Sequence, residues 1–571
     1  MIRSLLCLFV LFTAGSASAV DFASDFAKTP DRVWAGAAYW ANPMEDWAVQ
    51  DGRLECLGGG NRNVVLLTRS VTGKGAFEVS VRLGRMSKTS SAGTAGLRIG
   101  VRDEIDDYRA AALRGKGIDV GVDATTGELF LGKTTGDKLP EGDWLDEMTL
   151  TLAGTPTDEQ VALKLNAADA KGKTLATAEM TVPTERVVGL VALVNNHSAD
   201  GKSAKGRTGN RAAFWFADWK LTGEGVAAHD DRAWGPILWT MHTLHHTHSK
   251  AGTVLKMTAQ LVPMGKQGPK VAKLAFNTRD ALSEAKVDPL SCTATFRIEN
   301  WDATKAAKYT VLYGDAKRDG TIRVEPTDRP LVIAGFTGNT DYMFPNNAVA
   351  SNVEAQDPDV LFFSGDQIYE SVGGYGIVRA PTDNADEANI RRSTLNYLRK
   401  WYLWGWAFGD LMRDRPTVCL PDDHDVYQGN IWGEGGINPH GMGNHAKGGF
   451  AEHPDFVNTV LRTQCGHHPD LPDPKPMAQG INVIHGPMLY GRVSFAILAD
   501  RYFKSGPQDK VNTWGGRPDH VKDAKYDVTK LDKPGLELLG KRQERFLEDW
   551  AGDWRGADFK CVLSPVSYTH L

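Results

Sequence analysis

The chain has few cysteines, no excess of basic residues and no long apolar run, and each of these absences excludes a class of protein. It has six cysteines among 571 residues, too few and too widely spaced for the disulfide framework of a small secreted domain. It has no basic surplus, because 65 Lys and Arg face 70 Asp and Glu and the formal net charge is −5. A nucleic-acid-binding patch is therefore not expected. Beyond the N-terminus it has no run of about 20 apolar residues, so no transmembrane segment is expected.

The first residues have the order of a secretory signal peptide. Arg3 supplies a positive end, residues 5–12 form a short apolar run, and Ala17-Ser18-Ala19 is a small-x-small cleavage site. We expect residues 1–19 to be removed after Ala19 and the mature protein to be secreted, in the periplasm or outside the cell. A buried first strand is the alternative, but it does not explain this order. We expect most of the remaining cysteines to be buried thiols.

The first half of the mature chain has the pattern of an all-β protein. Residues 20–225 contain short runs in which apolar and polar residues alternate, separated by Gly, Asn and Asp: 76–83, 95–101, 118–122, 148–152, 188–194 and 212–219. This pattern predicts a jelly-roll sandwich and is similar to lectin-like modules of secreted hydrolases. Such a module is either purely structural or binds a carbohydrate or a surface.

Residues 226–328 predict a smaller β-sandwich of the Ig or fibronectin type, with strands near 254–262, 293–299 and 308–313. Before these strands, residues 241–248 contain four histidines. His242 and His246 are four positions apart, as on one face of a helix. No acidic residue completes a metal-binding pattern, so a polar, partly exposed interdomain segment is favoured over a metal site.

From residue 329 to residue 571 the pattern changes. Apolar strand-like runs alternate with helical segments at 391–411 and 540–550, and the strand-like runs lie at 331–334, 360–363, 417–420, 493–498 and 561–563. Buried strands that alternate with helices predict a layered α/β domain. Residues 429–490 are rich in Gly, Pro and His and show no periodicity, which predicts a long functional loop over the strand ends. A stable loop excursion with solvated histidines is an equally good interpretation.

Acidic residues follow three of these strands directly. They are Asp366, then Asp422, Asp423 and Asp425 around His424, and then Asp500. Ligands of open α/β sheets bind at the carboxyl ends of strands, so we expect these side chains to share one rim. Crowded carboxylates repel one another unless cations neutralise them. Taken singly, Asp366 is more simply a helix cap and the acidic run a solvated turn. Their joint placement favours a pair of metal ions, ~3.5–4 Å apart, of the kind that supports phosphoryl transfer.

The same residues resemble a known family. Gly365-Asp366-x-x-Tyr369, the run 422–425, the run 420–435 and residues 500–507 are similar to motifs of the PhoD-like (alkaline phosphatase D-like) branch of the calcineurin-like metallophosphoesterases. The resemblance covers roughly residues 230–571. It implies a β-sandwich ahead of a four-layer αββα catalytic domain. It also implies hydrolysis of a phosphate-ester substrate, with iron and calcium as the metal pair.

The resemblance further implies roles for individual residues. Asp366 would bridge the two metals, and Tyr369 would bind the iron-like site through its phenolate. Asp423 stands where related enzymes have a metal-binding Asn, and Asp422 beside it is a further candidate ligand. His424 would stabilise the leaving group or donate a proton to it.

The last strand end carries weaker candidates. Asp500 is either a metal ligand or a residue that orients one. Arg501 and Lys504 are candidates to hold phosphate oxygens. For Lys504, a surface cation without a catalytic role is an equally good interpretation.

Two departures from the family pattern affect the expected metal site. Gly338 stands where relatives commonly carry a Cys ligand, so Thr340 or Asp341 would have to replace it, or the site would prefer a harder cation with oxygen ligands. The closing Gly-Asp-x-His motif of the family is absent, and the last six residues resemble read-through of a cloning adapter. We therefore expect a catalytic domain that is truncated at its C-terminus and that can be inactive as it stands.

Together these features predict a secreted metal-dependent phosphoesterase, of the alkaline phosphatase or phosphodiesterase type, that uses two-metal in-line attack. The alternative is a secreted surface- or carbohydrate-binding protein with a degenerate, non-catalytic phosphoesterase domain. The sequence leaves open the substrate, which can be a monoester, a diester or a lipid. The metal identity and the oligomeric state are also left open.

Overall fold

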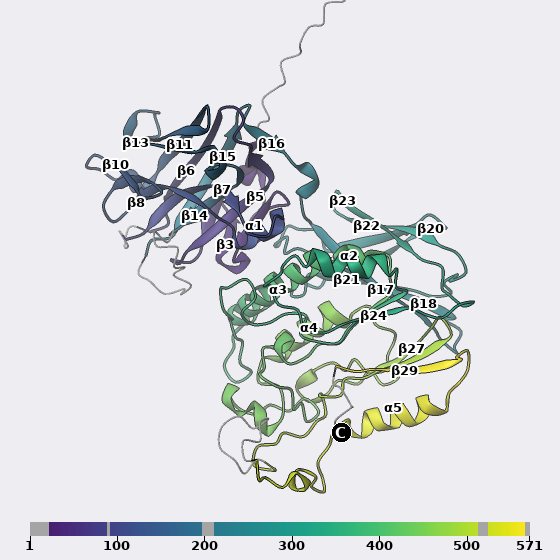
Figure 1. The fold of residues 1–571 in the computed structure, drawn as a ribbon. Coiled ribbons are helices and arrows are strands. Elements are labelled where there is room, and N and C mark those ends of the chain that lie inside the picture. The colour runs from purple at the N-terminus through teal and green to yellow at the C-terminus, as the bar shows by residue number, and fades with distance from the viewer. Residues whose placement is uncertain (1–21, 88–91, 197–210, 512–523, 566–571) are drawn as a thin grey trace, which may run out of the picture.

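The computed structural model describes residues 22–565 except 88–91, 197–210 and 512–523. An N-terminal β-sandwich is followed by a second β region and then by α/β layers (Figure 1). The predicted signal peptide and the last six residues lie outside the described residues. No helix in the described part of the chain is long and apolar enough to cross a membrane. The five described cysteines are free and four of them are buried, as expected.

The N-terminal sandwich consists of two eight-stranded antiparallel sheets. Alternation produces its core: in the strand 160–168, Val161, Leu163 and Leu165 are buried while the residues between them are exposed. One sheet contains β1 (Phe22–Ala23), β3 (Trp47–Gln50), β4 (Arg53–Cys56), β6 (Phe77–Arg85), β11 (Met148–Thr157), β12 (Gln160–Ala168), β13 (Thr174–Pro183) and β15 (Phe214–Thr222). The other contains β2 (Tyr39–Asn42), β5 (Arg62–Val71), β7 (Thr94–Arg102), β8 (Lys116–Asp123), β9 (Glu128–Leu131), β10 (Thr134–Lys138), β14 (Gly189–Asn195) and β16 (Val226–Ala228). A short helix, α1 (Tyr108–Arg114), connects β7 and β8.

The second β region has two small antiparallel sheets. One has the order β17 (Ile237–His246), β18 (Thr253–Leu261), β21 (Thr293–Ile298). The other has the order β20 (Arg279–Lys286), β19 (Val271–Phe276), β22 (Ala307–Tyr313), β23 (Ala316–Ile322).

The helical placement of His242 and His246 is wrong, because both lie on strand β17, which pairs with β18 along its length. The expected partial exposure of residues 241–248 is confirmed, because 241–244 are buried, 245–247 are half-buried and His248 is exposed. The strand itself is buried over residues 237–244. A strand that is covered on both faces loses its alternation, which removes the sequence signal for it.

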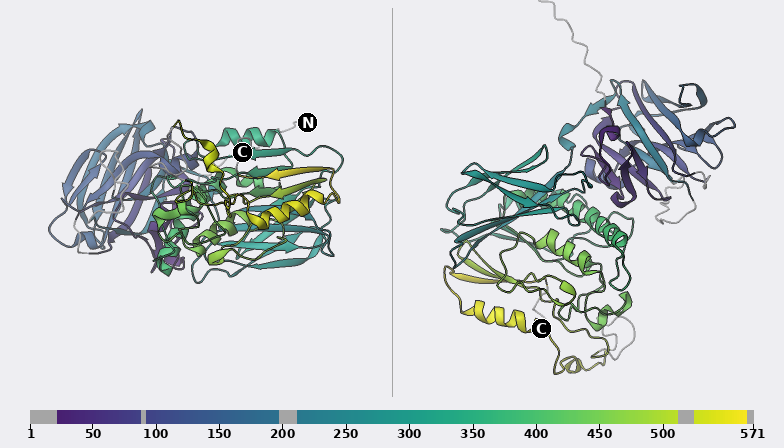
Figure 2. Two further views of the ribbon diagram at one scale, coloured as in Figure 1. Left: turned by 90° about the horizontal axis from the view of Figure 1, so that it is seen from below. Right: turned by 180° about the vertical axis from the view of Figure 1, so that it is seen from behind.

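The C-terminal layers contain two further sheets. In the first, β24 (Ile333–Phe336), β25 (Val360–Phe363) and β26 (Thr417–Cys419) are parallel. In the second, β28 (Val493–Ile497) is antiparallel to β27 (Gly486–Tyr490) and parallel to β29 (Phe559–Leu563). The helices are α2 (Asn347–Ala355), α3 (Glu387–Arg413), α4 (Pro454–Cys465) and α5 (Gly540–Gly552). In both views of Figure 2, β29 and α5 lie on the side of these layers away from the sandwich.

The region 429–490 is not the continuous loop that was predicted, because it contains α4. His453 caps this helix by accepting a hydrogen bond from the Asp455 N–H, and Pro454 occupies its first turn. The apolar pairs 456–457 and 460–461, four positions apart, are all buried and were a readable helix signal. Of the histidines in this region, His467, His468 and His485 are buried and do not face solvent.

Candidate metal centre

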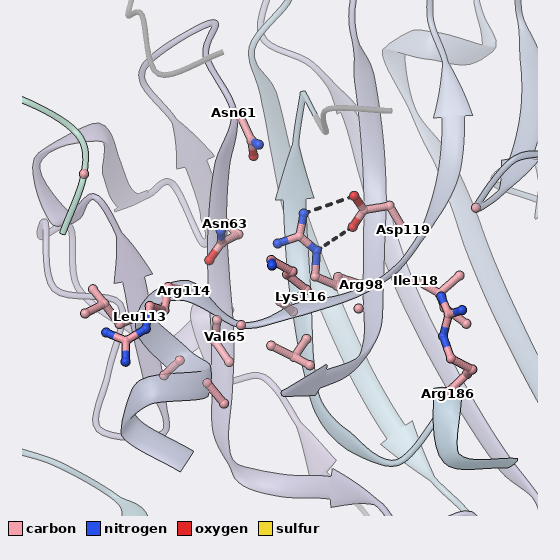
Figure 3. A pocket seen from close by; sticks show the side chains of 18 of the residues that line it. Asn61, Asn63, Val65, Arg98, Leu113, Arg114, Lys116, Ile118, Asp119 and Arg186 are labelled. Carbon is pink, nitrogen blue, oxygen red and sulfur yellow. Dashed lines mark hydrogen bonds and ion pairs between the residues drawn. The ribbon is translucent and has the colours of Figure 1, made fainter. Parts of the chain in front are cut away.

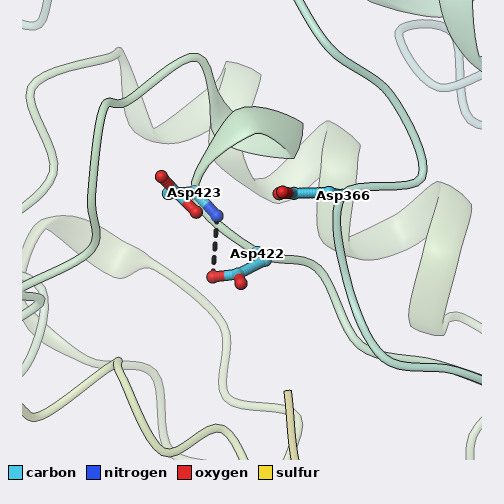
Figure 4. Close-up of side chains that lie close together, drawn as sticks. All are labelled: Asp366, Asp422 and Asp423. Atoms are coloured by element: carbon cyan, nitrogen blue, oxygen red, sulfur yellow. Dashed lines mark hydrogen bonds between the residues drawn. The ribbon is translucent and has the colours of Figure 1, made fainter. Parts of the chain in front are cut away.

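Three carboxylates from two loops come together where β25 and β26 end. Asp366, Asp422 and Asp423 each offer one oxygen, and these oxygens lie within 4.8 Å of one another (Figure 4). Asp366 has a left-handed backbone, with φ of +52°, which turns the chain sharply after β25. Its buried Oδ1 has no hydrogen-bond partner among the described residues.

The close packing of these carboxylates disfavours their ionised forms. Burial and then the neighbouring Asp423 raise the pKa of Asp366. Burial also raises the pKa of Asp422, although the guanidinium of Arg501 opposes the shift. A bound cation would reverse this balance, because it favours the carboxylate form that coordinates it. The oxygen-only donors and the unpartnered Oδ1 of Asp366 fit a hard divalent cation.

The second sheet supplies a cation to the same cluster. Arg501, after β28, places Nη1 2.9 Å from Asp422 Oδ1 and 3.1 Å from Asp423 Oδ1. The predicted common rim is therefore formed by two sheets and not by one. Lys504 is half-buried nearby, and burial, followed by the charge of Arg501, lowers its pKa.

Two of the predicted rim residues lie outside this cluster. Asp500 is 1% exposed, and its Oδ2 accepts a hydrogen bond of 2.5 Å from Ser564 Oγ. Asp425 turns inward and accepts hydrogen bonds from the backbone N–H groups of Asp422 and Ile368. Asp425 thus holds the two loops together, a role that its sequence neighbourhood did not reveal.

His424 lies beside the carboxylates and has an acidic partner that the sequence analysis missed. Its Nδ1 lies 2.6 Å from Glu370 Oε2, and this hydrogen bond is the largest cause that raises the pKa of His424 to about 9. The ring of Tyr369 lies 4.5 Å from the His424 ring, centroid to centroid. Burial and then Asp366 raise the pKa of the Tyr369 phenol. Glu370 directly follows Tyr369 in the motif, which was its readable signal.

Gly338, which stands where relatives commonly carry a Cys ligand, faces Tyr369. Gly338 has φ of +58°, and a Cβ atom there would lie 3.0 Å from the Tyr369 hydroxyl. A side chain at 338 would therefore point at the centre, and this chain has none. Asp341 does not replace it, because its Oδ2 accepts a hydrogen bond from the Gly373 N–H at 2.8 Å. Thr340 lines a cavity of about 270 Å³ together with Gly338 and Asp366.

Carboxylates, an arginine and a carboxylate-paired histidine at the strand ends of two α/β sheets form a site suited to phosphate esters. Residues 336–567, less than half of the chain, match the family model of the PhoD-like phosphatases. This match is consistent with a PhoD-like member and confirms the predicted resemblance over these residues. No curated protein matches the chain.

Solved structures also match part of the chain. The Emp46p carbohydrate recognition domain, in a mutant form, has 14% identity and a TM-score of 0.24, with 35% of this chain and 95% of that chain covered. The Bauhinia forficata lectin in complex with GalNAc has 9% identity and a TM-score of 0.24, with 36% and 99% covered. Peanut lectin with a 9mer peptide has 10% identity and a TM-score of 0.25, with 37% and 100% covered.

Proposed function

We propose that this protein is a metal-dependent phosphoesterase that hydrolyses phosphate esters. The observation that carries the proposal is the convergence of Asp366, Asp422 and Asp423 within 4.8 Å. They lie beside Arg501 and His424, on the part of the chain that matches the PhoD-like phosphatases. Only Asp422 of the three is buried, but carboxylates this close repel one another, and a cation bound between them removes the repulsion.

The residues have complementary roles in this proposal. Asp366, Asp422, Asp423 and the Tyr369 phenol hold the metal. A bound metal neutralises charge on phosphoryl oxygens and activates water. Asp500, buried against Ser564, supports the rim and is the weakest candidate ligand.

Two side chains act on the substrate itself. Arg501, whose Nη1 lies 2.9 Å from Asp422 Oδ1, would donate hydrogen bonds to phosphate oxygens. Glu370 holds His424 through Nδ1 at 2.6 Å, which leaves Nε2 as the nitrogen that donates a proton to the leaving group.

The finer domain layout also belongs to this proposal. The two C-terminal sheets, with α2 and α3 before β26 and α5 before β29, support an αββα catalytic domain over 329–571. An Ig-like sandwich over 226–328 and a lectin-like jelly roll over 20–225 would precede it. The Arg3-to-Ala19 pattern supports export of the chain and cleavage after Ala19.

The test compares two site variants of the full chain. Asp366→Asn should lose bound metal and hydrolysis of matched mono- and diester substrates together. His424→Ala should keep the metal and lose rate by about 10²–10⁴-fold, as expected for a lost general acid. Asp455→Asn, an exposed aspartate on α4, is the control and should keep both properties. Metal content is measured by elemental analysis, and unchanged metal and rate in Asp366→Asn would refute the proposal.

Two observations favour a second candidate, a surface- or carbohydrate-binding protein with a degenerate phosphoesterase domain. Gly338 offers no side chain to the centre, and Arg501 already pairs with two of the three aspartates. Absence of both metal and hydrolysis in the wild-type chain, with retained binding to a glycan, would select this candidate.

A further inference from the structure

A large groove lies between the N-terminal sandwich and a loop of the C-terminal layers, away from the three aspartates. It has a volume of about 940 Å³, and the sandwich supplies most of its wall from β5, β7, β8 and the end of α1 (Figure 3). Asp341 and residues 373–375 complete the wall from the C-terminal side. A second hollow of about 390 Å³ shares Lys116, Gly117 and Arg186 with it, so the groove continues along the sandwich.

The groove is positively charged although the whole chain carries a formal charge of −5. Its wall holds two carboxylates, Asp119 and Asp341, against five cations: Arg98, Arg114, Lys116, Lys133 and Arg186. In the described ranges, no carboxylate lies within ion-pair distance of the last three, all of which are exposed. Unpaired cations gathered in a concavity attract an anionic ligand.

The remaining two cations have fixed positions. Arg98 donates to both carboxylate oxygens of Asp119, at 2.6 and 3.0 Å, in the centre of the sheet face (Figure 3). Arg114 pairs with Asp103 at 3.1 Å and donates to the Asp341 carbonyl at 2.7 Å. This second contact ties the sandwich wall to the C-terminal wall, so the groove is a preformed feature of the fold.

The shape and chemistry of the wall narrow the class of ligand. A nucleic acid strand needs aromatic side chains on which its bases stack. Tyr375 is the aromatic residue of the described wall, and the guanidinium groups of Arg62 and Arg399 lie 5.1 and 5.9 Å from its ring. Its ring is therefore occupied by arginines.

The wall of the groove instead has polar groups that can form hydrogen bonds with the hydroxyl groups of a ligand. Asn61 Oδ1 is buried and has no hydrogen-bond partner among the described residues. Gly115, Gly117 and Gly132 expose backbone along the same wall. A volume of about 940 Å³ is at the upper end of ligand sites, which commonly measure about 300–1,000 Å³, and it suits several linked units better than a single ion.

We propose that this groove binds an anionic oligosaccharide, a sugar chain that carries carboxylate or sulfate groups. The acidic groups of the sugar chain would be bound by the exposed Lys116, Lys133 and Arg186. Its hydroxyl groups would hydrogen-bond to Asn61 and to the exposed backbone. None of the three aspartates of the candidate metal centre lines the groove, so binding does not depend on the proposed hydrolysis.

The experiment measures binding by calorimetry on the full chain. The probes are oligogalacturonate, a sulfated carrageenan oligosaccharide, a neutral cello-oligosaccharide and single-stranded DNA of matched charge. We expect one or both of the acidic oligosaccharides to bind, and the difference in affinity between them to identify the preferred acid group. The neutral oligosaccharide and the DNA should not bind. The triple variant Lys116→Ala, Lys133→Ala, Arg186→Ala should weaken binding at least about tenfold, since exposed charges contribute modestly each.

The matched control is Lys220→Ala, an exposed lysine on β15 of the other sheet, and it should change affinity by less than about twofold. Equal loss in Lys220→Ala, preferred binding of DNA or of the neutral chain, or no binding of either acidic oligosaccharide would each overturn the proposal. Hydrolysis of a small phosphate ester should be the same in the triple variant and the wild type. A failure of the glycan site is thereby distinguished from a failure of the phosphoesterase proposal.

Discussion

At the scale of single residues, the centre depends on a close approach of two loops that a glycine permits. Gly365, with φ of +122°, precedes Asp366, and a Cβ atom there would lie 2.6 Å from the Asp422 Cβ atom. This distance is well inside van der Waals contact, so a side chain would push the loops after β25 and β26 apart. The carboxylate cluster thus requires the Gly365-Asp366 pair and not the aspartate alone.

We expect Gly365→Ala to lower bound metal and to reduce hydrolysis at least about tenfold, because the aspartates would no longer share a cation. Gly172→Ala is the matched control, since Gly172 has φ of +81° but nothing within 4 Å of its Cβ position. This control should lose about 1–2 kcal/mol of stability from backbone strain and keep its metal and rate. Elemental analysis and steady-state rates check both variants. Equal metal content in Gly365→Ala and the wild type would show that the loops tolerate separation.

At the scale of elements, β17 and the segment that follows α4 contain three buried histidines. His242 is 0% exposed, neither ring nitrogen has a hydrogen-bond partner in the described part of the chain, and burial lowers its pKa to about 3. His467 Nε2 lies 2.9 Å from the Thr417 carbonyl oxygen, and burial lowers its pKa to about 3. His468 accepts a hydrogen bond from the Cys419 N–H, and burial lowers its pKa well below the ordinary value.

These histidines predict an acid-sensitive fold. Below pH 6.5 the unfolded chain protonates them, while the folded chain keeps His242 and His467 neutral down to about pH 3. Burial likewise holds the pKa of His468 well below its ordinary value. The free energy of unfolding therefore falls as the pH falls through this window, by about 2 kcal/mol per histidine between pH 7.5 and 5.0. His242→Phe should remove one such contribution in chemical denaturation. Phe296→Leu, a core change without a titrating group, should change stability but keep the pH dependence. Identical pH dependence in wild type and His242→Phe would contradict this account.

At the scale of the whole molecule, buried charges join the sandwich to helix α3. They start from η2 (Met44–Asp46), where Glu45 accepts hydrogen bonds from Asn396 at 2.7 Å and Arg399 at 3.2 Å. The neighbouring Asp46 pairs with Arg392 and with Arg62. Arg399 also donates to the carbonyl oxygen of Val372 at 2.9 Å. The sandwich thereby supports the chain segment that follows Glu370.

Removal of one partner should leave a buried charge without compensation. We expect Glu45→Ala to lower the free energy of unfolding by about 3–5 kcal/mol, because Arg399 has a side chain 2% exposed. Glu147→Ala removes an exposed pair with Arg82 and should cost less than about 1 kcal/mol. Denaturant unfolding of the full chain measures both. A loss in Glu45→Ala no larger than in the control would mean that the sandwich and α3 are not energetically coupled here.

The local sequence pattern was sufficient to predict those strands and motifs that depend on few long-range contacts. Alternation predicted strands such as β6 and β11, and the apolar run before each motif predicted β25 and β26. The Gly-Asp-x-x-Tyr and Asp-Asp-His-Asp motifs named the three aspartates that meet. Their meeting follows from chain connectivity, because neighbouring parallel strands place their following loops at one edge.

Only the tertiary structure decided the rest, because the deciding contacts join residues far apart in the chain. The helical prediction for the residues of β17 was wrong because a strand that is buried on both faces lacks the alternation of apolar and polar residues. Asp425 and Asp500 resemble Asp366 in sequence, yet packing turned one inward and placed the other against Ser564. Glu370 gained its role from His424, 54 positions away. The cationic groove has walls from two distant parts of the chain, and Arg114 joins them by donating to the Asp341 carbonyl oxygen, a contact that no local pattern encodes.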